Sequence, residues 1–233
     1  MAALSLNKKM EFLAIKYARE GQLAMLQKMD FDKYKINILT IGDEICLNGH
    51  LNIMKWFHKK YPNFYPMNLL PNHVKCAVNH PHILDWYHSI GCDIFNYLTC
   101  CHVIRHSKEP LNMLKWLILE RNCPLSPILY AVAVEKKRYD IIEWLQSVGC
   151  PTDEEACSAA ASYGDLNILK WLRSHNFPWN KDTTDVASFM KEYLIYKWAV
   201  KNGCPRNVEN DNENFRDYDD IELNYKSNHI SSL

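Results

Sequence analysis

Glycine is scarce in this chain, with seven residues among 233. A phosphate-binding loop needs several closely spaced glycines, so the sequence argues against a site of that kind. The chain also lacks a GxSxG motif and any arrangement of paired carboxylates beside an apolar stretch. Because these motifs position nucleophiles and acid–base groups, we predict that the protein is not an enzyme and has no catalytic or cofactor-binding residues.

An excess of charge of either sign is also missing, because 27 Lys and Arg residues balance 27 Asp and Glu residues. Proteins that coat nucleic acid or an anionic membrane surface carry surplus positive charge, so we expect neither partner. The longest apolar stretch, residues 127–134, is far shorter than the roughly 18 residues that a membrane helix needs. Lys8 and Lys9 interrupt the apolar N-terminus, so we expect no secretory signal. We therefore predict a cytoplasmic protein whose nine cysteines stay reduced.

What the sequence does contain is a regular series of tryptophans. Six of the seven recur at intervals of 27 to 30 residues: Trp56, Trp86, Trp116, Trp144, Trp171 and Trp198. The residues three and two positions before each one are apolar, and the residue directly before it is charged. A further copy without its tryptophan runs from Gly21 to Met29, with Lys28 in the tryptophan position. Self-similarity at this period is the signature of a repeat array with about seven units.

Turn residues follow the same register. Gly21, Gly49 and Gly164 lie seven residues before the tryptophan position, and Gly91, Gly149 and Gly203 lie five residues after it. Asn79, Asn122 (after one inserted residue) and Asn176 take these places in other units. Glycine and asparagine tolerate the left-handed backbone of a tight turn. Each unit is therefore predicted to be a helix, a tight turn, a second helix and a short connector, and in one unit Thr152 and Glu155 form a capping box.

The stretch from Gly164 to Asn176, GDLNILKWLRSHN, resembles the second half of an ankyrin repeat, and GHLNIMKWF from Gly49 to Phe57 is similar. The tryptophan and the Gly-Cys-Pro endings resemble the divergent ankyrin-type repeats abundant in giant DNA viruses. The resemblance covers residues 10–205. It implies an all-α fold, an α-solenoid of stacked helix-turn-helix repeats. The T-P-L-H motif is absent and the period is shorter than in ankyrin, so we expect short connectors with little or no β-hairpin.

We accordingly divide the chain into a repeat array over residues 1–205 and an acidic, Asn-rich tail over residues 206–233. The tail has few aliphatic residues, a composition that predicts a flexible segment. An alternative is that residues 215–225 fold back and cover the open end of the last repeat, because terminal repeats need a polar cover.

Two kinds of role are open for the aromatic and basic residues. We interpret the six periodic tryptophans as the structural core of the repeats. Trp179 lies in a connector outside the series, where it is either an exposed interface anchor or packed under the loop, and Tyr65 is a similar case. Lys136, Lys137 and Arg138 replace a turn glycine, either as a solvated turn or as a docking point for an anionic partner.

Cysteine and histidine are concentrated between residues 73 and 106. Zinc binds both residue types, and His102 and His106 could share a helical face. No CxxC pair is present, however, and the register aligns Cys76 with Ala161 and Cys92 with Cys150. The register therefore explains several of these residues as small buried packing residues, and we predict no metal ligands. The members of the cluster are His73, Cys76, His80, His82, His88, Cys92, Cys100, Cys101, His102 and His106.

The resemblance implies a non-enzymatic ankyrin-repeat scaffold for protein–protein interaction, of viral origin, acting as a monomer on host or viral proteins in the host cytoplasm. One alternative is a substrate adaptor of a ubiquitin ligase, although one helix from Lys8 to Arg19 precedes Gly21 and no F-box is visible. A second alternative is a zinc- or thiol-dependent protein that uses the cluster at residues 73–106. The identity of the protein partner does not follow from the sequence.

Overall fold

The computed structural model describes residues 2–62 and 70–207, and the side chains of residues 6–62 and 74–207. The described residues form fourteen α-helices and one π-helical turn, with no strand among them. The all-α class predicted from the sequence is confirmed. The chain divides into two compact units, residues 1–125 and 126–233, which are described separately.

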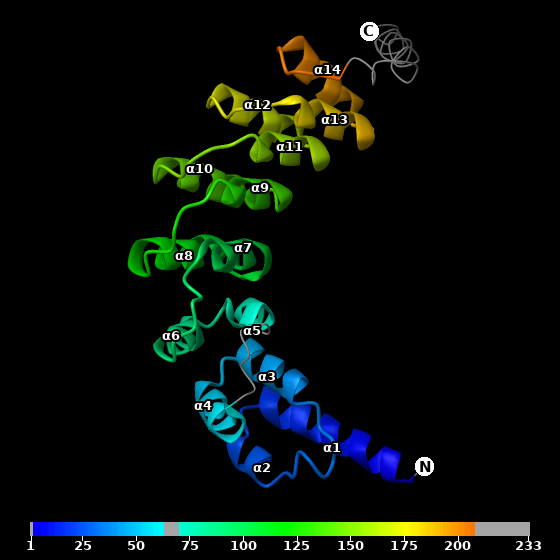
Figure 1. Ribbon diagram of the computed structural model, residues 1–233, viewed down its shortest axis with the longest axis vertical. Helices are drawn as coiled ribbons and strands as arrows, with labels where there is room; N and C mark the ends of the chain where they lie inside the picture. The colour runs from blue at the N-terminus through cyan, green and yellow to red at the C-terminus, as the bar shows by residue number, and fades with distance from the viewer. Residues whose placement is uncertain (1, 63–69, 208–233) are drawn as a thin grey trace, which may run out of the picture. The chain divides into compact units, whose positions relative to one another are not determined.

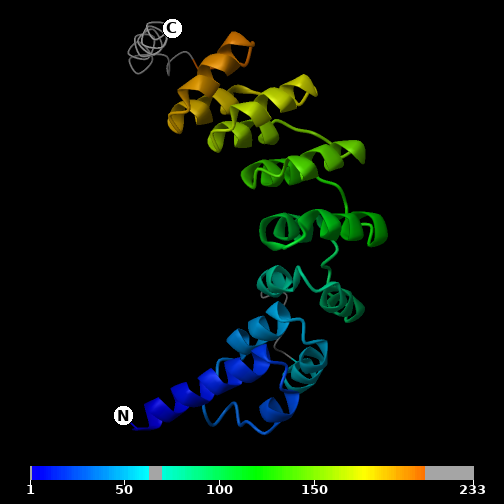
Figure 2. The same ribbon diagram turned by 180° about the vertical axis from the view of Figure 1, so that it is seen from behind.

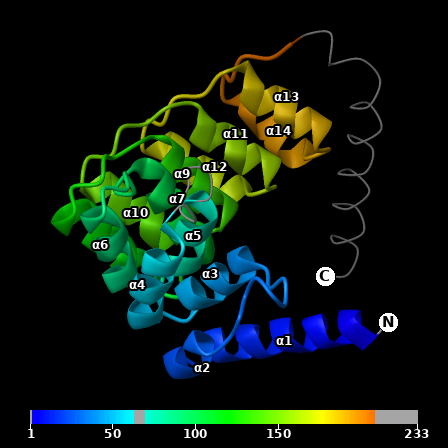
Figure 3. The same cartoon turned by 60° about the horizontal axis from the view of Figure 1, so that its bottom comes forward.

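The first unit contains four helix pairs. The first helices of the pairs, α1, α3, α5 and α7, contact one another in chain order, and each second helix packs on the first helix of its own pair (Figure 1). Helix α1 is the longest, and its N-terminal half extends past α3 (Figure 3). The helices are α1 (Ala2–Arg19), α2 (Leu23–Gln27), α3 (Ile38–Leu47), α4 (Leu51–Lys60), α5 (Leu70–Ala77), α6 (Pro81–Ser89), α7 (Tyr97–His106) and α8 (Pro110–Lys115), which the π-helical turn η3 (Trp116–Glu120) continues.

The second unit contains three more pairs in the same arrangement. Helix α11 packs between α9 and α13, and α10, α12 and α14 each contact their own first helix (Figure 2). Four small residues of α11, Ala156, Cys157, Ala160 and Ala161, are completely buried and allow this close approach. The helices are α9 (Ile128–Glu135), α10 (Tyr139–Ser147), α11 (Glu155–Ser162), α12 (Leu166–Ser174), α13 (Lys181–Phe189) and α14 (Tyr193–Lys201). The seven sequence units therefore coincide with seven helix pairs.

The buried face of the second helices lies beside the tryptophans rather than at them. The residues three and two positions before each tryptophan, and the residue after it, are buried in all six pairs. The position after the tryptophan is fully buried throughout: Phe57, Tyr87, Leu117, Leu145, Leu172 and Ala199. All six tryptophans are only partly buried. Since successive residues turn by about 100°, the tryptophan lies roughly 100° from the centre of the buried arc, at the margin of the core.

The turns confirm the left-handed conformation expected at the glycines. Gly21, Gly49, Gly91, Gly149, Gly164 and Gly203 all have φ between 68° and 90°, and Asn122 and Asn176 have φ of 55° and 62°. Lys137 and Lys191 adopt φ of 52° and 63° at the same position of pairs that lack the glycine. Asn79 is the exception. Its backbone is not left-handed, and its side-chain oxygen instead accepts hydrogen bonds from Ser107 and Lys108.

The inserted residue before Asn122 has a structural explanation. After Lys115 the helix widens into the π-helical turn η3, and Arg121 N donates to Trp116 O across five residues. A π-helical turn accommodates one extra residue without ending the helix. The left-handed Asn122 therefore still ends the second helix, although it lies six residues after Trp116 and not five as in other pairs.

The capping box is wrong, because Asp153 rather than Thr152 accepts the hydrogen bond from Glu155 N, at 3.1 Å, near the start of α11. An aspartate one residue later offers its carboxylate in an Asx turn, which replaces the threonine hydroxyl. Tyr65 and the tail from residue 208 onward lie outside the described residues.

Truncating the buried residue after a tryptophan should lower the free energy of unfolding more than truncating the exposed residue before it. Leu172→Ala removes a fully buried side chain of α12 and should lower the free energy of unfolding by about 2 to 5 kcal/mol. Lys170→Ala, an exposed residue of the same helix, should change it by about 0.5 kcal/mol or less. Urea titration of both variants measures this, and equal losses would show that the buried arc is misplaced.

Two glycines with the same backbone but different surroundings provide a matched test. Gly149→Ala, at φ 73° with no atom within 4 Å of the new Cβ, should cost about 1 to 2 kcal/mol for the left-handed backbone. Gly49→Ala, at φ 75°, places its Cβ 2.5 Å from His80 Nδ1 and should cost clearly more. Thermal unfolding of the two variants compares them, and the reverse order would contradict the close approach of His80.

Candidate functional site

The turns of successive helix pairs contact one another through the residue directly after the turn position occupied by Gly49, Asn79 or Lys191. In the first unit, His50 Nε2 lies 2.9 Å from Arg19 O, and His80 Nε2 lies 2.9 Å from Leu47 O. The two imidazoles lie against Gly21 and Gly49 so closely that no Cβ fits there. His82 Nε2 adds a contact of 2.9 Å to Gly49 O. Each histidine therefore holds the C-terminal end of the preceding first helix, where carbonyl groups lack helical partners.

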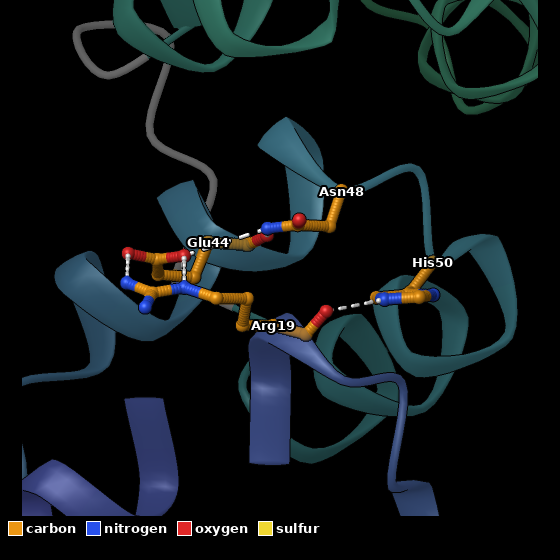
Figure 4. A network of polar contacts seen from close by, with 4 residues as sticks. All are labelled: Arg19, Glu44, Asn48 and His50. Carbon is orange, nitrogen blue, oxygen red and sulfur yellow. Dashed lines mark hydrogen bonds and ion pairs between the residues drawn. The ribbon is translucent and has the colours of Figure 1, made fainter. Parts of the chain in front are cut away.

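The junction of the first two pairs also contains a bidentate ion pair (Figure 4). Arg19 Nε and Nη2 donate to the Glu44 carboxylate at 3.2 and 3.0 Å, which joins the end of α1 to α3. Asn48 Nδ2 donates to Glu44 O at 2.8 Å and to the Glu44 carboxylate at 3.4 Å. Because two parallel hydrogen bonds set both distance and orientation, this contact determines how the first turn lies beside the second.

The second unit has an equivalent contact with different chemistry. Tyr139 OH donates to both Asp165 carboxylate oxygens at 3.3 Å, and the same carboxylate accepts from Ile168 N and caps α12. The Glu192 carboxylate lies against Gly164 in the way His50 lies against Gly21. The turns of α9–α10, α11–α12 and α13–α14 are thereby held in one continuous row.

This row presents a set of exposed side chains that we call the turn edge. Tyr139 and Tyr163 are 40% and 47% exposed, and the lysines beside them are exposed as well. Rigid aromatic side chains on a surface are the residues that most often anchor protein interfaces. The turn edge consists of Lys136, Lys137, Tyr139, Tyr163 and Lys191.

The basic cluster expected at residues 136–138 is partly neutralised within the turn. Lys136 Nζ lies 3.0 Å from a Glu135 oxygen, and Arg138 donates to both Asp140 oxygens at 2.8 and 2.6 Å. The Arg138 hydrogen bonds hold the pKa of the Asp140 carboxyl below its usual value. Lys137 stays exposed at its left-handed position. The cluster therefore offers less positive charge to an anionic partner than its sequence indicates.

Trp179 is packed rather than freely exposed. The Arg173 guanidinium lies 4.1 Å from its ring centroid on one side, and the Trp198 ring contacts it at a centroid distance of 5.9 Å. Phe95 contacts Trp116 at 5.9 Å, and Phe31 contacts Trp56 at 6.4 Å, in the same way. An aromatic residue of the connector thus packs on the next tryptophan, and Trp179 has this role in the last pair.

The cysteine and histidine cluster is spread over several contacts. His80 and His82 bind backbone carbonyls, His88 packs on Phe95, and Cys100 and Cys123 share a thiol hydrogen bond. The His102 and His106 rings stack with centroids 6.2 Å apart. No group of three or more His, Cys, Asp or Glu residues lies close enough to hold a metal ion in the part of the chain that the structure describes, and the His73 side chain is outside that part.

The cysteines of the Gly-Cys-Pro connectors have a packing role. Cys150 Sγ donates to Ser126 O at 3.4 Å, and Cys204 Sγ donates to Asn180 O at 3.2 Å. Each thiol follows the second helix of its pair and binds a carbonyl group just before the first helix of the same pair. Burial raises the pKa of both thiols to about 11, so they are protonated at neutral pH. A nucleophilic cysteine needs the opposite shift.

No model of a known protein family matches the chain, and a search of the curated proteins finds no relative. The resemblance to ankyrin-type repeats therefore depends on the residues and their spacing. Among the described residues, no helix combines the length and the apolar composition needed to cross a membrane.

His102 should make the protein less stable in mild acid. Burial, with the positive charges of His106, Arg105 and Lys75, lowers its pKa in the folded state. The unfolded state, with a pKa of about 6.5, then binds more protons as the pH falls below this value, and the free energy of unfolding decreases. His102→Gln should lose less stability than the wild type between pH 7.5 and 5.5.

Urea midpoints at the two pH values measure this difference. His88→Gln, which removes an exposed imidazole, serves as the control. A variant at position 102 with the same pH dependence as the wild type would show that the imidazole does not titrate differently in the two states.

Proposed function

We propose that the chain is an ankyrin-type repeat protein, an α-solenoid that binds another protein rather than catalysing a reaction. The contacts of first helices in chain order within each unit, and the fastened turns, support a repeat architecture. Such architectures act mainly through extended recognition surfaces. The resemblance to repeats of giant DNA viruses supports a viral protein that acts on host or viral partners in the host cytoplasm.

The observation that carries the proposal is the turn edge of the second unit. Its two tyrosines expose a large part of their rings although the contacts of Asp165 and Glu192 hold the turns in place. A side chain that is already ordered loses less conformational entropy when it binds, so a fixed row of aromatic residues favours recognition. Lys137 and Lys191 at the left-handed positions lie in the same row and favour a partner with acidic residues beside its apolar contacts.

The row also has the composition of a protein interface rather than of a nucleic-acid surface. The carboxylates of Glu135, Asp140, Asp165 and Glu192 lie among its lysines. A phosphate backbone needs an uncompensated set of cations, which this arrangement does not supply. Tyrosine with mixed charges around it suits the centre and rim of a protein–protein contact.

The partner should crosslink to the turn edge and depend on its tyrosines. In cells that express the protein naturally, crosslinking followed by mass spectrometry should join a saturable protein partner to Lys136, Lys137 or Lys191. The double variant Tyr139→Ala with Tyr163→Ala should weaken binding of that partner at least about tenfold, as expected for interface anchors.

The matched control is Glu143→Ala with Lys170→Ala, two exposed residues on the second helices of the same two pairs. This variant should bind like the wild type, and thermal unfolding verifies that both variants fold. Crosslinks that map elsewhere, or equal binding by both double variants, would refute the turn edge as the binding surface.

A further inference from the structure

The last helix pair of the described chain exposes three large apolar side chains. Phe189 and Met190 lie at the C-terminal end of α13, and after the turn Leu194, Lys197 and Lys201 follow one stripe of α14, spaced by three and four residues. Phe189 is 85% exposed, Leu194 70% and Met190 46%. We call these five residues the terminal face. Figure 1 shows α14 as the last helix of the second unit.

The terminal face differs from the same stripe in the other pairs. At the position of Leu194, four residues before the tryptophan, the other five tryptophan-containing pairs have polar residues: Asn52, His82, Asn112, Asp140 and Asn167. All five of these residues are exposed, so the position faces solvent in every pair. A leucine and a phenylalanine exposed to this extent indicate a surface that another segment covers.

The chain contains a segment with matching chemistry directly after this pair. Residues 208–233 carry seven acidic and two basic residues, whereas residues 178–207 carry five basic and three acidic residues. Apolar residues alternate with the acids between residues 215 and 225, at Phe215, Tyr218, Ile221, Leu223 and Tyr225. This composition is complementary to the terminal face, which combines exposed apolar side chains at Phe189 and Leu194 with the amines of Lys197 and Lys201.

The length of the connection permits the contact. Phe215 lies eight positions after Asn207, with seven residues between them, and an extended chain covers about 3.3 Å per position, or roughly 26 Å. Helix α14 has nine residues and is about 13 Å long, so the segment can return along its whole length. A short tether gives a local concentration on the order of millimolar, so even weak contacts are populated.

We propose that residues 215–225 dock on the terminal face of their own chain, with apolar residues on Phe189, Met190 and Leu194 and carboxylates facing Lys197 and Lys201. The contact covers the outward face of α14 and the adjoining end of α13, and it does not depend on the function proposed for the turn edge. The surface is then occupied within the monomer and is not available to a second copy or to another protein unless the segment is displaced.

Zero-length carbodiimide crosslinking of the full-length protein tests the contact, because the reagent joins lysine amines only to carboxylates that touch them. We expect amide bonds from Lys197 or Lys201 to Asp217, Asp219, Asp220 or Glu222. Leu194→Asn, which introduces the residue present in other pairs, should reduce their yield about tenfold, and so should Phe215→Ser with Ile221→Ser. Ile230→Ser, outside the docking segment, should leave the yield unchanged.

Mixing isotopically light and heavy protein separates the possible occupants. Crosslinks within one chain support the proposal, whereas light–heavy crosslinks would assign the face to a second copy and overturn it. Crosslinks of the tail to Lys170 as frequent as those to Lys197 would indicate unspecific contact and overturn it as well. Hydrogen exchange gives an independent result: residues 189–201 should exchange several-fold faster in the Phe215→Ser, Ile221→Ser variant, and unchanged exchange would contradict the docking.

Discussion

The burial of three side chains on each tryptophan-containing second helix is the constraint on which the rest of this structure depends. A pair of helices of 8 to 10 residues has too little apolar surface for a core of its own, so its buried arc must be completed by a neighbour. The isoleucines, leucines and other apolar residues around each tryptophan position supply this arc in six pairs. The tryptophans border it, and four of them, Trp56, Trp116, Trp171 and Trp198, contact aromatic residues of the connectors at the margin of the core.

The same constraint explains the turns. Two helices that must pack on each other and on the next pair need a tight reversal, and within most pairs a left-handed glycine or lysine supplies it, with Asn79 an exception. The residue after this turn position then contacts the preceding turn, as His50, His80 and Glu192 do. Fastening the turns in this way places exposed tyrosines and lysines in one row, so the surface that we propose for binding is a consequence of the packing.

The period of the sequence predicted the helix pairs because each pair repeats one set of packing demands. It did not predict that the tryptophans lie at the margin of the core, since an indole can fill a core or border it with the same spacing. The sequence could not decide whether Trp179 is exposed or packed, because the residues that it contacts, Arg173 and Trp198, belong to two different helix pairs. The sequence pointed to Lys136 and Lys137 of the turn edge but not to Tyr139, Tyr163 or Lys191. The position after the turn is Pro110 in one pair and polar in the others, and this polar series marks where successive turns lie: His50, His80, Arg138, Asp165 and Glu192.

Native-state hydrogen exchange of the second unit tests most directly whether the helix pairs depend on one another. Helix α11 has a first helix on either side, so its amides should exchange more slowly than those of α9 and α13 and only through an opening that exposes a neighbouring pair as well. Denaturant should then lower the protection of α11 together with that of a neighbour. Three pairs that open independently, each with its own denaturant dependence, would contradict the account.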